Sequence, residues 1–167
     1  GRLYHANAYG AHAAQSYQVA MEFDSDNPRW PYYLAVLRQE KGDTASATQL
    51  LERAVALAPG YAPAWLRLAD TRFKQGHTER ARAGYQRRLD LSPGDPYAHL
   101  GLARVALAAS RWDSAETHLR NAIATDPSFD PAHRLLASVH EHFGRPQEMS
   151  AALVQADDGA RFAAAPD

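Results

Sequence analysis

Cysteine is absent from the 167 residues of the sequence. Without it the protein has no disulfide framework, no thiolate zinc site, no iron–sulfur cluster and no cysteine nucleophile. An apolar run of about 18 residues, the minimum for a transmembrane helix, is missing too, and the mean hydropathy is -0.49. We therefore expect a soluble protein whose fold depends on packing alone.

An excess of charge of either sign is also lacking. The chain carries 19 acidic against 18 basic residues, a formal net charge of -1. No global field attracts nucleic acid or an anionic membrane, so we expect neither as a partner. Lysine is scarce beside arginine and alanine is abundant, a bias typical of GC-rich bacterial genomes. The sequence thus indicates a bacterial source, but it assigns no cellular compartment.

Enzyme motifs are missing as well. The sequence contains no GxxxxGK phosphate loop, no GxGxxG, no GxSxG elbow and no HExxH. The most inviting cluster is His140-Glu141-His142. Side chains two positions apart on a helix point about 200° apart, so the two rings cannot hold one metal. We expect no catalytic residue, no metal site and no cofactor.

What the sequence does contain is a 34-residue repeat. Pro59, Pro93 and Pro127 follow one another at this step. Two further columns keep the same register, a leucine before an alanine (Leu34, Leu68, Leu102, Leu136) and a turn residue (Gly42, Gly76, Ser110, Gly144). Apolar residues recur at three- and four-residue steps between these points, which predicts two helices in each unit and no strand.

The expected helix pairs are 28–41 with 44–57, 62–75 with 78–91, 96–109 with 112–125, and 130–143 with 146–157. Three of the first helices begin with a capping side chain before proline: Asn27-Pro28, Asp95-Pro96 and Asp130-Pro131. Residues 3–23 fit the same columns as the end of one helix and the second helix of an earlier repeat. Because a repeat cannot bury its apolar face alone, we expect the natural protein to extend beyond Gly1.

These columns make the chain similar to the tetratricopeptide repeat family. The unit 62–95 carries the resemblance best, through Trp65, Leu68, Ala69, Gly76, Ala81, Tyr85 and Pro93. The resemblance implies an all-α fold, a right-handed superhelix of antiparallel helix pairs. It divides the chain into a partial repeat at 1–27, repeats at 28–61, 62–95, 96–129 and 130–157, the last with an atypical second helix, and a polar, alanine-rich tail at 158–167.

Two columns contain unusual residues. Arg88 stands where the other repeats have Ala54, Ala122 and Ala156, and a long cation there must reach solvent or find a carboxylate. Trp65, His99 and His133 share one column, which we interpret as a packing position.

Seven basic residues between positions 67 and 88 form the one notable charge run, and we interpret it as a solvated outer face.

In the family that the chain resembles, the first helix of each repeat lines a concave groove. Carried over to this sequence, the groove positions are Tyr32, Val36, Gln39, Leu66, Asp70, Phe73, Lys74, Leu100, Arg104, Arg134, Ser138 and Glu141. The first two rows of the groove lack the Lys and Asn with which chaperone-binding members hold a C-terminal carboxylate. The apolar positions with a few charged handles suit an amphipathic helix or an extended peptide.

The resemblance therefore implies a non-catalytic interaction scaffold that binds a peptide or a helix of a protein partner in this groove. Two alternatives stay open. The chain could associate with further copies of itself through its ends, or it could be a docking or regulatory domain of a larger protein. The sequence does not identify the partner.

Overall fold

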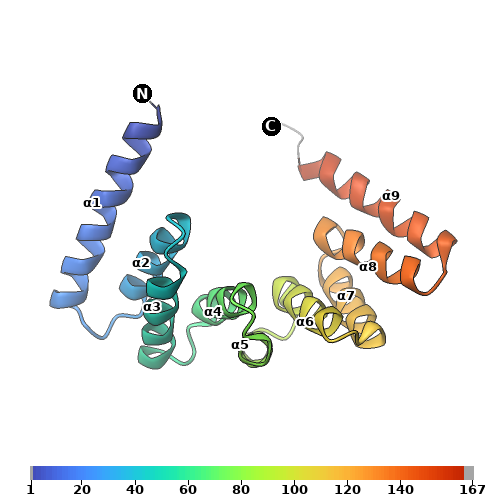
Figure 1. Cartoon of the computed structure of the whole chain (residues 1–167), viewed down its shortest axis with the longest axis horizontal. Helices are drawn as coiled ribbons and strands as arrows, with labels where there is room; N and C mark the ends of the chain where they lie inside the picture. The colour runs from blue at the N-terminus through green and yellow to red at the C-terminus, as the bar shows by residue number, and fades with distance from the viewer. Residues whose placement is uncertain (1, 164–167) are drawn as a thin grey trace. The chain divides into compact units, whose positions relative to one another are not determined.

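The computed structural model describes residues 2–163 of the chain, and the side chains of residue 10 and of 12–157. Within that range the chain is helical, without a strand (Figure 1). The helices are α1 Arg2–Phe23, α2 Arg29–Glu40, α3 Thr44–Leu57, α4 Ala62–Lys74, α5 Thr78–Leu91, α6 Pro96–Ala108, α7 Trp112–Thr125, α8 Asp130–His142 and α9 Pro146–Ala163. The chain divides into two compact units, residues 1–84 and 85–167. The boundary between them in the sequence falls within α5.

The turn column predicted from the 34-residue step ends the first helix of each pair. Gly42, Gly76 and Gly144 have φ of 77°, 78° and 65°, and Ser110 has φ of 56°. A left-handed residue just after a helix terminates it and lets the next amide bond back to the last turn. Glycine adopts this conformation without a steric penalty, whereas Ser110 is the uncommon non-glycine case. The predicted helix bounds from residue 28 to residue 145 are confirmed to within a residue.

The two ends of the chain differ from the expectation. Residues 2–23 form the single helix α1 instead of the expected end of one helix followed by the second helix of an earlier repeat. Counting back 34 residues from Gly42 reaches Ala8, which lies inside α1 and makes no left-handed turn. At the other end α9 runs on to Ala163, so much of the expected tail at 158–167 is helical, and residues 164–167 lie outside the described part.

The three expected caps have different outcomes. Asp95 caps α6, since its carboxylate accepts a hydrogen bond of 2.8 Å from the amide of Ala98. Asn27 accepts instead from the amide of Arg29, and α2 has no side-chain cap. Asp130 lies in the first turn of α8 rather than before it. A proline lies in the first turn of α6 and α8 and directly before α2, so it marks all three starts, whereas the residue before the proline caps only α6.

In unit 1, α1 to α4 pack in chain order, as their neighbouring positions in Figure 1 show. The core is dominated by alanine and leucine, namely Ala35, Ala47, Leu51, Ala54, Val55, Ala64 and Leu68. The alanines allow the helices to approach closely. Aromatic rings hold α1 in place, because the ring of Tyr17 stacks 5.6 Å from that of Tyr33 and 6.3 Å from that of Trp30.

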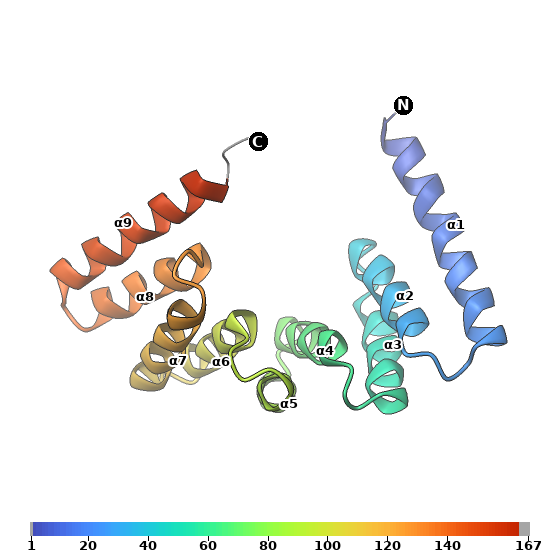
Figure 2. The same cartoon turned by 180° about the vertical axis from the view of Figure 1, so that it is seen from behind.

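In unit 2, α7 packs on α6, α8 on α7 and α9 on α8 (Figure 2). The buried cluster contains Leu100, Ala103, Ala106, Ala115, Leu119, Ala122, Phe129, Ala132, Leu136 and Val139. Tyr85, in α5, is 1% exposed. Its ring lies directly over Gly101 in α6, where a β-carbon would overlap the ring atoms.

The rings of Trp65 and His133, which occupy the same column, form hydrogen bonds between consecutive helix pairs. The indole nitrogen of Trp65 donates to the Pro59 carbonyl at 2.9 Å. Two repeats further on, Nε2 of His133 lies 2.9 Å from the Pro127 carbonyl, so that nitrogen carries the proton. In both cases a ring on the first helix bonds to the proline that ended the preceding helix. The packing interpretation of this column is confirmed.

Candidate functional site

Three of the predicted groove positions of unit 2 lie around a shallow cavity of about 390 Å³. Arg104 from α6 and Arg134 and Ser138 from α8 line it, together with Asp130, Pro131 and Leu135. The structure thus brings together three of the groove residues inferred from sequence. The cavity combines charged groups with apolar surface from a proline and a leucine.

The two arginines of this cavity differ in what they bind. Arg134 donates from Nε to Asp130 at 2.7 Å and from Nη2 to Asp157 at 3.5 Å. Its guanidinium is therefore shared between two carboxylates. Arg104 is exposed and has no hydrogen bond or ion pair with any residue that the structure describes. The guanidinium of Arg104 is consequently the cation that a ligand in this cavity would meet.

Two other groove positions of unit 2 have different surroundings. Leu100 is 5% exposed and belongs to the core of the unit, so its side chain does not lie on a binding surface. The reason is that α6 is buried along much of its length, with seven of its residues inside. Glu141 is exposed on α8.

In unit 1 two groove positions on α2, Gln39 and Tyr32, contact α4 or the residue before it. The amide of Gln39 donates to the Thr71 hydroxyl at 2.5 Å and accepts from Arg67 at 3.2 Å. The ring of Tyr32 meets that of Tyr61 edge to face, with 5.4 Å between centroids. Gln39 thus stabilises the contact between α2 and α4 with its own hydrogen bonds. The remaining positions are half-buried (Val36, Leu66, Asp70, Phe73) or exposed (Lys74).

The basic run between positions 67 and 88 is largely neutralised by carboxylates. Arg72 pairs with Glu52 at 3.0 Å and Arg82 with Glu79 at 2.9 Å. Arg87 pairs with Asp90 at 3.8 Å, and Arg88 with Asp95. Of the two outcomes open for Arg88, the structure shows the second, because this side chain is 18% exposed and the Asp95 side chain 8%. Four of the seven cations of the run are thus paired, and no ion pair is formed by Arg67, Lys74 or Arg80 with the residues that the structure describes.

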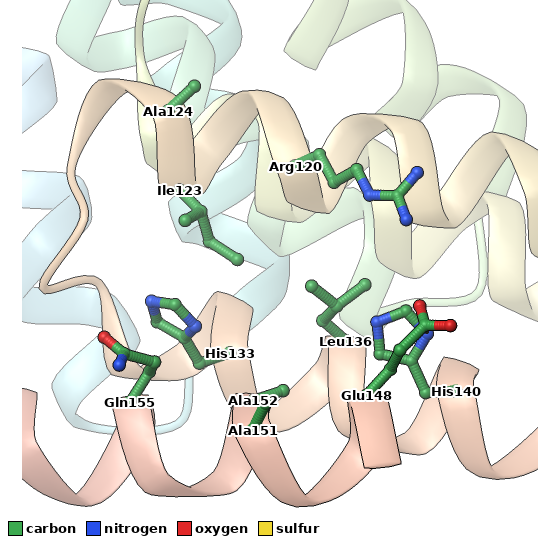
Figure 3. A pocket seen from close by; sticks show the side chains of 10 residues that line it. All are labelled: Arg120, Ile123, Ala124, His133, Leu136, His140, Glu148, Ala151, Ala152 and Gln155. Atoms are coloured by element: carbon green, nitrogen blue, oxygen red, sulfur yellow. The ribbon is translucent and has the colours of Figure 1, made fainter. Parts of the chain in front are cut away.

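A second cavity, of about 420 Å³, lies between α7, α8 and α9 (Figure 3). His133 and Gln155 lie toward one end of it, and His140 and Glu148 toward the other. The sequence did not predict these residues as a group, since they come from different helices and share no local spacing. Two histidines of α8, His133 and His140, are visible in the sequence, but a histidine alone does not distinguish a packing position from a site.

A pair of half-buried histidines lies between α6 and α7. Nδ1 of His99 and Nδ1 of His118 are 3.3 Å apart. Burial lowers the pKa of both rings below the ordinary value of 6.5, and for His118 the neighbouring His99 lowers it further. For His99, a hydrogen bond with the Pro93 backbone and the charge of Asp95 oppose the shift. The fold thus favours the neutral form of both rings.

We expect acid to destabilise unit 2 through this pair. A histidine whose pKa falls on folding binds fewer protons in the native than in the unfolded state, so the free energy of unfolding decreases as the pH drops below about 6.5. The melting temperature measured between about pH 7.5 and pH 5 should fall less in the variant His99→Gln/His118→Gln than in the parent. Equal falls in the two proteins would contradict the assignment.

Among the residues that the structure describes, no helix has both the length and the apolar composition to cross a membrane.

The comparisons with known proteins agree on the fold. Residues 38–104 and 85–139 match the family model for the tetratricopeptide repeat (TPR). The crystal structure of MamA is 20% identical over 96% of this chain and 94% of its own, with a TM-score of 0.83. PilF of Pseudomonas aeruginosa is 15% identical, over 93% of this chain and 71% of its own, with a TM-score of 0.84.

A third structure is YrrB, described as a TPR protein with an unusual peptide-binding site. It is 18% identical over 95% of this chain and 81% of its own, with a TM-score of 0.74. No curated protein sequence matches the chain. The predicted fold class, an all-α arrangement of tetratricopeptide helix pairs, is confirmed.

Proposed function

The chain belongs to the tetratricopeptide repeat family, and on this premise we propose that it is a non-catalytic scaffold that binds a peptide or a helix of a partner protein. The observation that carries the proposal is the cavity between α6 and α8 in unit 2. Three of the predicted groove positions line it, and YrrB, a protein of similar fold, is described as having a peptide-binding site; both observations support the proposal.

The charges of this cavity indicate the chemistry of the partner. Arg104 presents an uncompensated guanidinium, whereas Arg134 is held by Asp130 and Asp157. A carboxylate on the ligand would pair with Arg104, since guanidinium and carboxylate form strong two-point hydrogen bonds. Pro131 and Leu135 offer apolar contact beside it. We therefore expect an acidic peptide with at least one apolar side chain.

A random peptide library displayed on phage provides the probe, followed by fluorescence anisotropy with the selected peptides made synthetically. We expect selected peptides rich in Asp or Glu, and about ten-fold weaker binding to the Arg104→Ala variant, because a central arginine is a frequent hot spot. Arg82→Ala is the matched control, since this exposed arginine pairs with Glu79 and is not among the residues that line the cavity.

Unchanged affinity in Arg104→Ala, with unchanged helicity, would contradict the assignment to unit 2. The variant Phe73→Ala distinguishes the groove positions of unit 1. If this variant alone lost binding, the site would belong to α4 rather than to the cavity between α6 and α8.

One observation favours self-association as a second function. Among the side chains that the structure describes, several large apolar ones are exposed, with Val19 and Phe23 on α1, and Leu153 and Val154 on α9. Phe23 is 87% exposed. Exposed apolar side chains on α1 and α9 would be buried if these helices packed against a further copy, because natural capping repeats present a polar outer face instead. Light scattering over a dilution series separates a self-associating protein from a monomeric binder.

A further inference from the structure

Three potential metal ligands from three helices meet beside the cavity of Figure 3. They are Glu116 on α7, His140 on α8 and Glu148 on α9. One ligand atom from each lies within 4.8 Å of the other two. Figure 3 shows the His140 ring and the Glu148 carboxylate next to each other at the same end of the cavity. The cluster is independent of the cavity between α6 and α8.

His140 has a buried nitrogen without a hydrogen-bond partner. The residue is 4% exposed, and its Nδ1 is the one buried side-chain polar atom without a partner among the described residues. Nδ1 lies 3.5 Å from Oε2 of Glu148 and 3.8 Å from Oε1 of Glu116. Hydrogen bonds from nitrogen to oxygen span about 2.7–3.2 Å. A buried polar atom left without a partner costs about 1–3 kcal/mol, so this position needs an explanation.

The spacing fits two ligands of one metal ion better than it fits a hydrogen bond. Zinc binds histidine nitrogen and carboxylate oxygen at about 2.0–2.2 Å in tetrahedral geometry, which separates two ligand atoms by about 3.3 Å. The two distances at Nδ1 need to contract by only a few tenths of an ångström to reach this value. We propose that Glu116, His140 and Glu148 bind a divalent transition-metal ion of the zinc type, with the fourth position open to water.

Two arginines form ion pairs with these carboxylates. Arg120 lies 2.7 Å from Oε1 of Glu116, and Arg145 lies 3.1 Å from the same oxygen and 3.9 Å from Glu148. Their side chains are 59% and 40% exposed, so both can turn toward solvent when an ion enters. The arginines neutralise the carboxylates in the metal-free protein and compete with the metal. Removal of Arg145, which contacts both carboxylates, should therefore tighten metal binding.

The ion would join three helices of unit 2. Glu148 lies in the first turn of α9, and α7 and α9 each pack against α8. A metal held by all three stabilises the folded state in proportion to its occupancy, because the site does not exist in the unfolded chain. Binding should thus raise the melting temperature of the protein.

The test uses the full chain freed of metal, with zinc chloride as the probe in calorimetric titration and cobalt chloride for the visible spectrum of tetrahedral coordination. We expect one zinc ion per chain and a higher melting temperature. His140→Ala should abolish binding, and Glu148→Gln, at an exposed side chain that the fold does not need, should weaken it by about ten-fold or more. Arg145→Gln should strengthen it.

His142→Ala is the matched control, since this exposed histidine on the same helix stacks on Trp112. It should bind zinc as the parent does. The proposal is overturned if the parent binds no zinc, if Glu148→Gln binds it unchanged, or if His118→Ala abolishes binding, which would move the ion to the pair of His99 and His118.

Discussion

We expect the Gly101→Ala variant to unfold at a lower urea concentration than the parent, with a loss of about 2 kcal/mol in the free energy of unfolding. Helix propensity alone predicts the opposite sign, a gain of about 1 kcal/mol for glycine to alanine inside a helix. Packing decides the sign here. A β-carbon on Gly101 would overlap the ring of Tyr85, which is 1% exposed and has no room to move away.

The chain offers a matched control and a rescue for this variant. An added β-carbon at Gly10, also inside a helix, meets nothing within 4 Å, so Gly10→Ala should be neutral or stabilising. Leucine occupies the position of Tyr85 in the repeats before and after, at Leu51 and Leu119. Adding Tyr85→Leu to Gly101→Ala should therefore recover part of the loss. A Gly101→Ala variant as stable as the parent would refute the steric argument.

Replacing Arg88 by alanine should cost about 3 kcal/mol, as is typical when one partner of a buried ion pair is removed. The Nε of Arg88 donates to Asp95 at 3.0 Å, and the same carboxylate caps α6 through Ala98. Without Arg88 the charge of Asp95 stays buried and uncompensated. The other repeats have alanine at this position, so a comparison of the repeats alone would predict a harmless change. Urea unfolding measures the difference.

Arg87→Ala is the control for this loss, because Arg87 is 42% exposed and its pair with Asp90 spans 3.8 Å. It should change the free energy of unfolding by no more than about 0.5 kcal/mol. Asp95→Ser in the Arg88→Ala background keeps a capping oxygen and removes the orphaned charge. This double variant should be more stable than Arg88→Ala alone, and the ion-pair explanation fails if it is not.

The helices were predictable from the sequence because their stop signals are local. A residue in the turn column reverses the chain whatever packs around it, and this holds even for Ser110, which resembles the glycines in position rather than in chemistry. The exception is α1, where Ala8 stands in that column and the helix continues. A missing stop signal is harder to recognise than one that is present.

The groove positions stay a prediction, and the structure places them differently. Arg104 and Ser138 line a cavity, whereas Leu100 lies in the core. Contacts between distant residues could not be predicted, because the 34-residue columns describe what repeats share. The contact of Tyr85 with Gly101 and the cluster around His140 each depend on residues that occur in one repeat only.

The hydrogen bonds from Trp65 to Pro59 and from His133 to Pro127 have a consequence for how the protein opens. Each bond joins the last turn of one repeat to the first helix of the next. In a nearest-neighbour description of repeat stability, its energy belongs to the coupling between repeats and not to either repeat alone. Amide protons on both sides of such a bond should exchange with solvent in the same opening event, because one repeat cannot unfold without releasing the start of its neighbour.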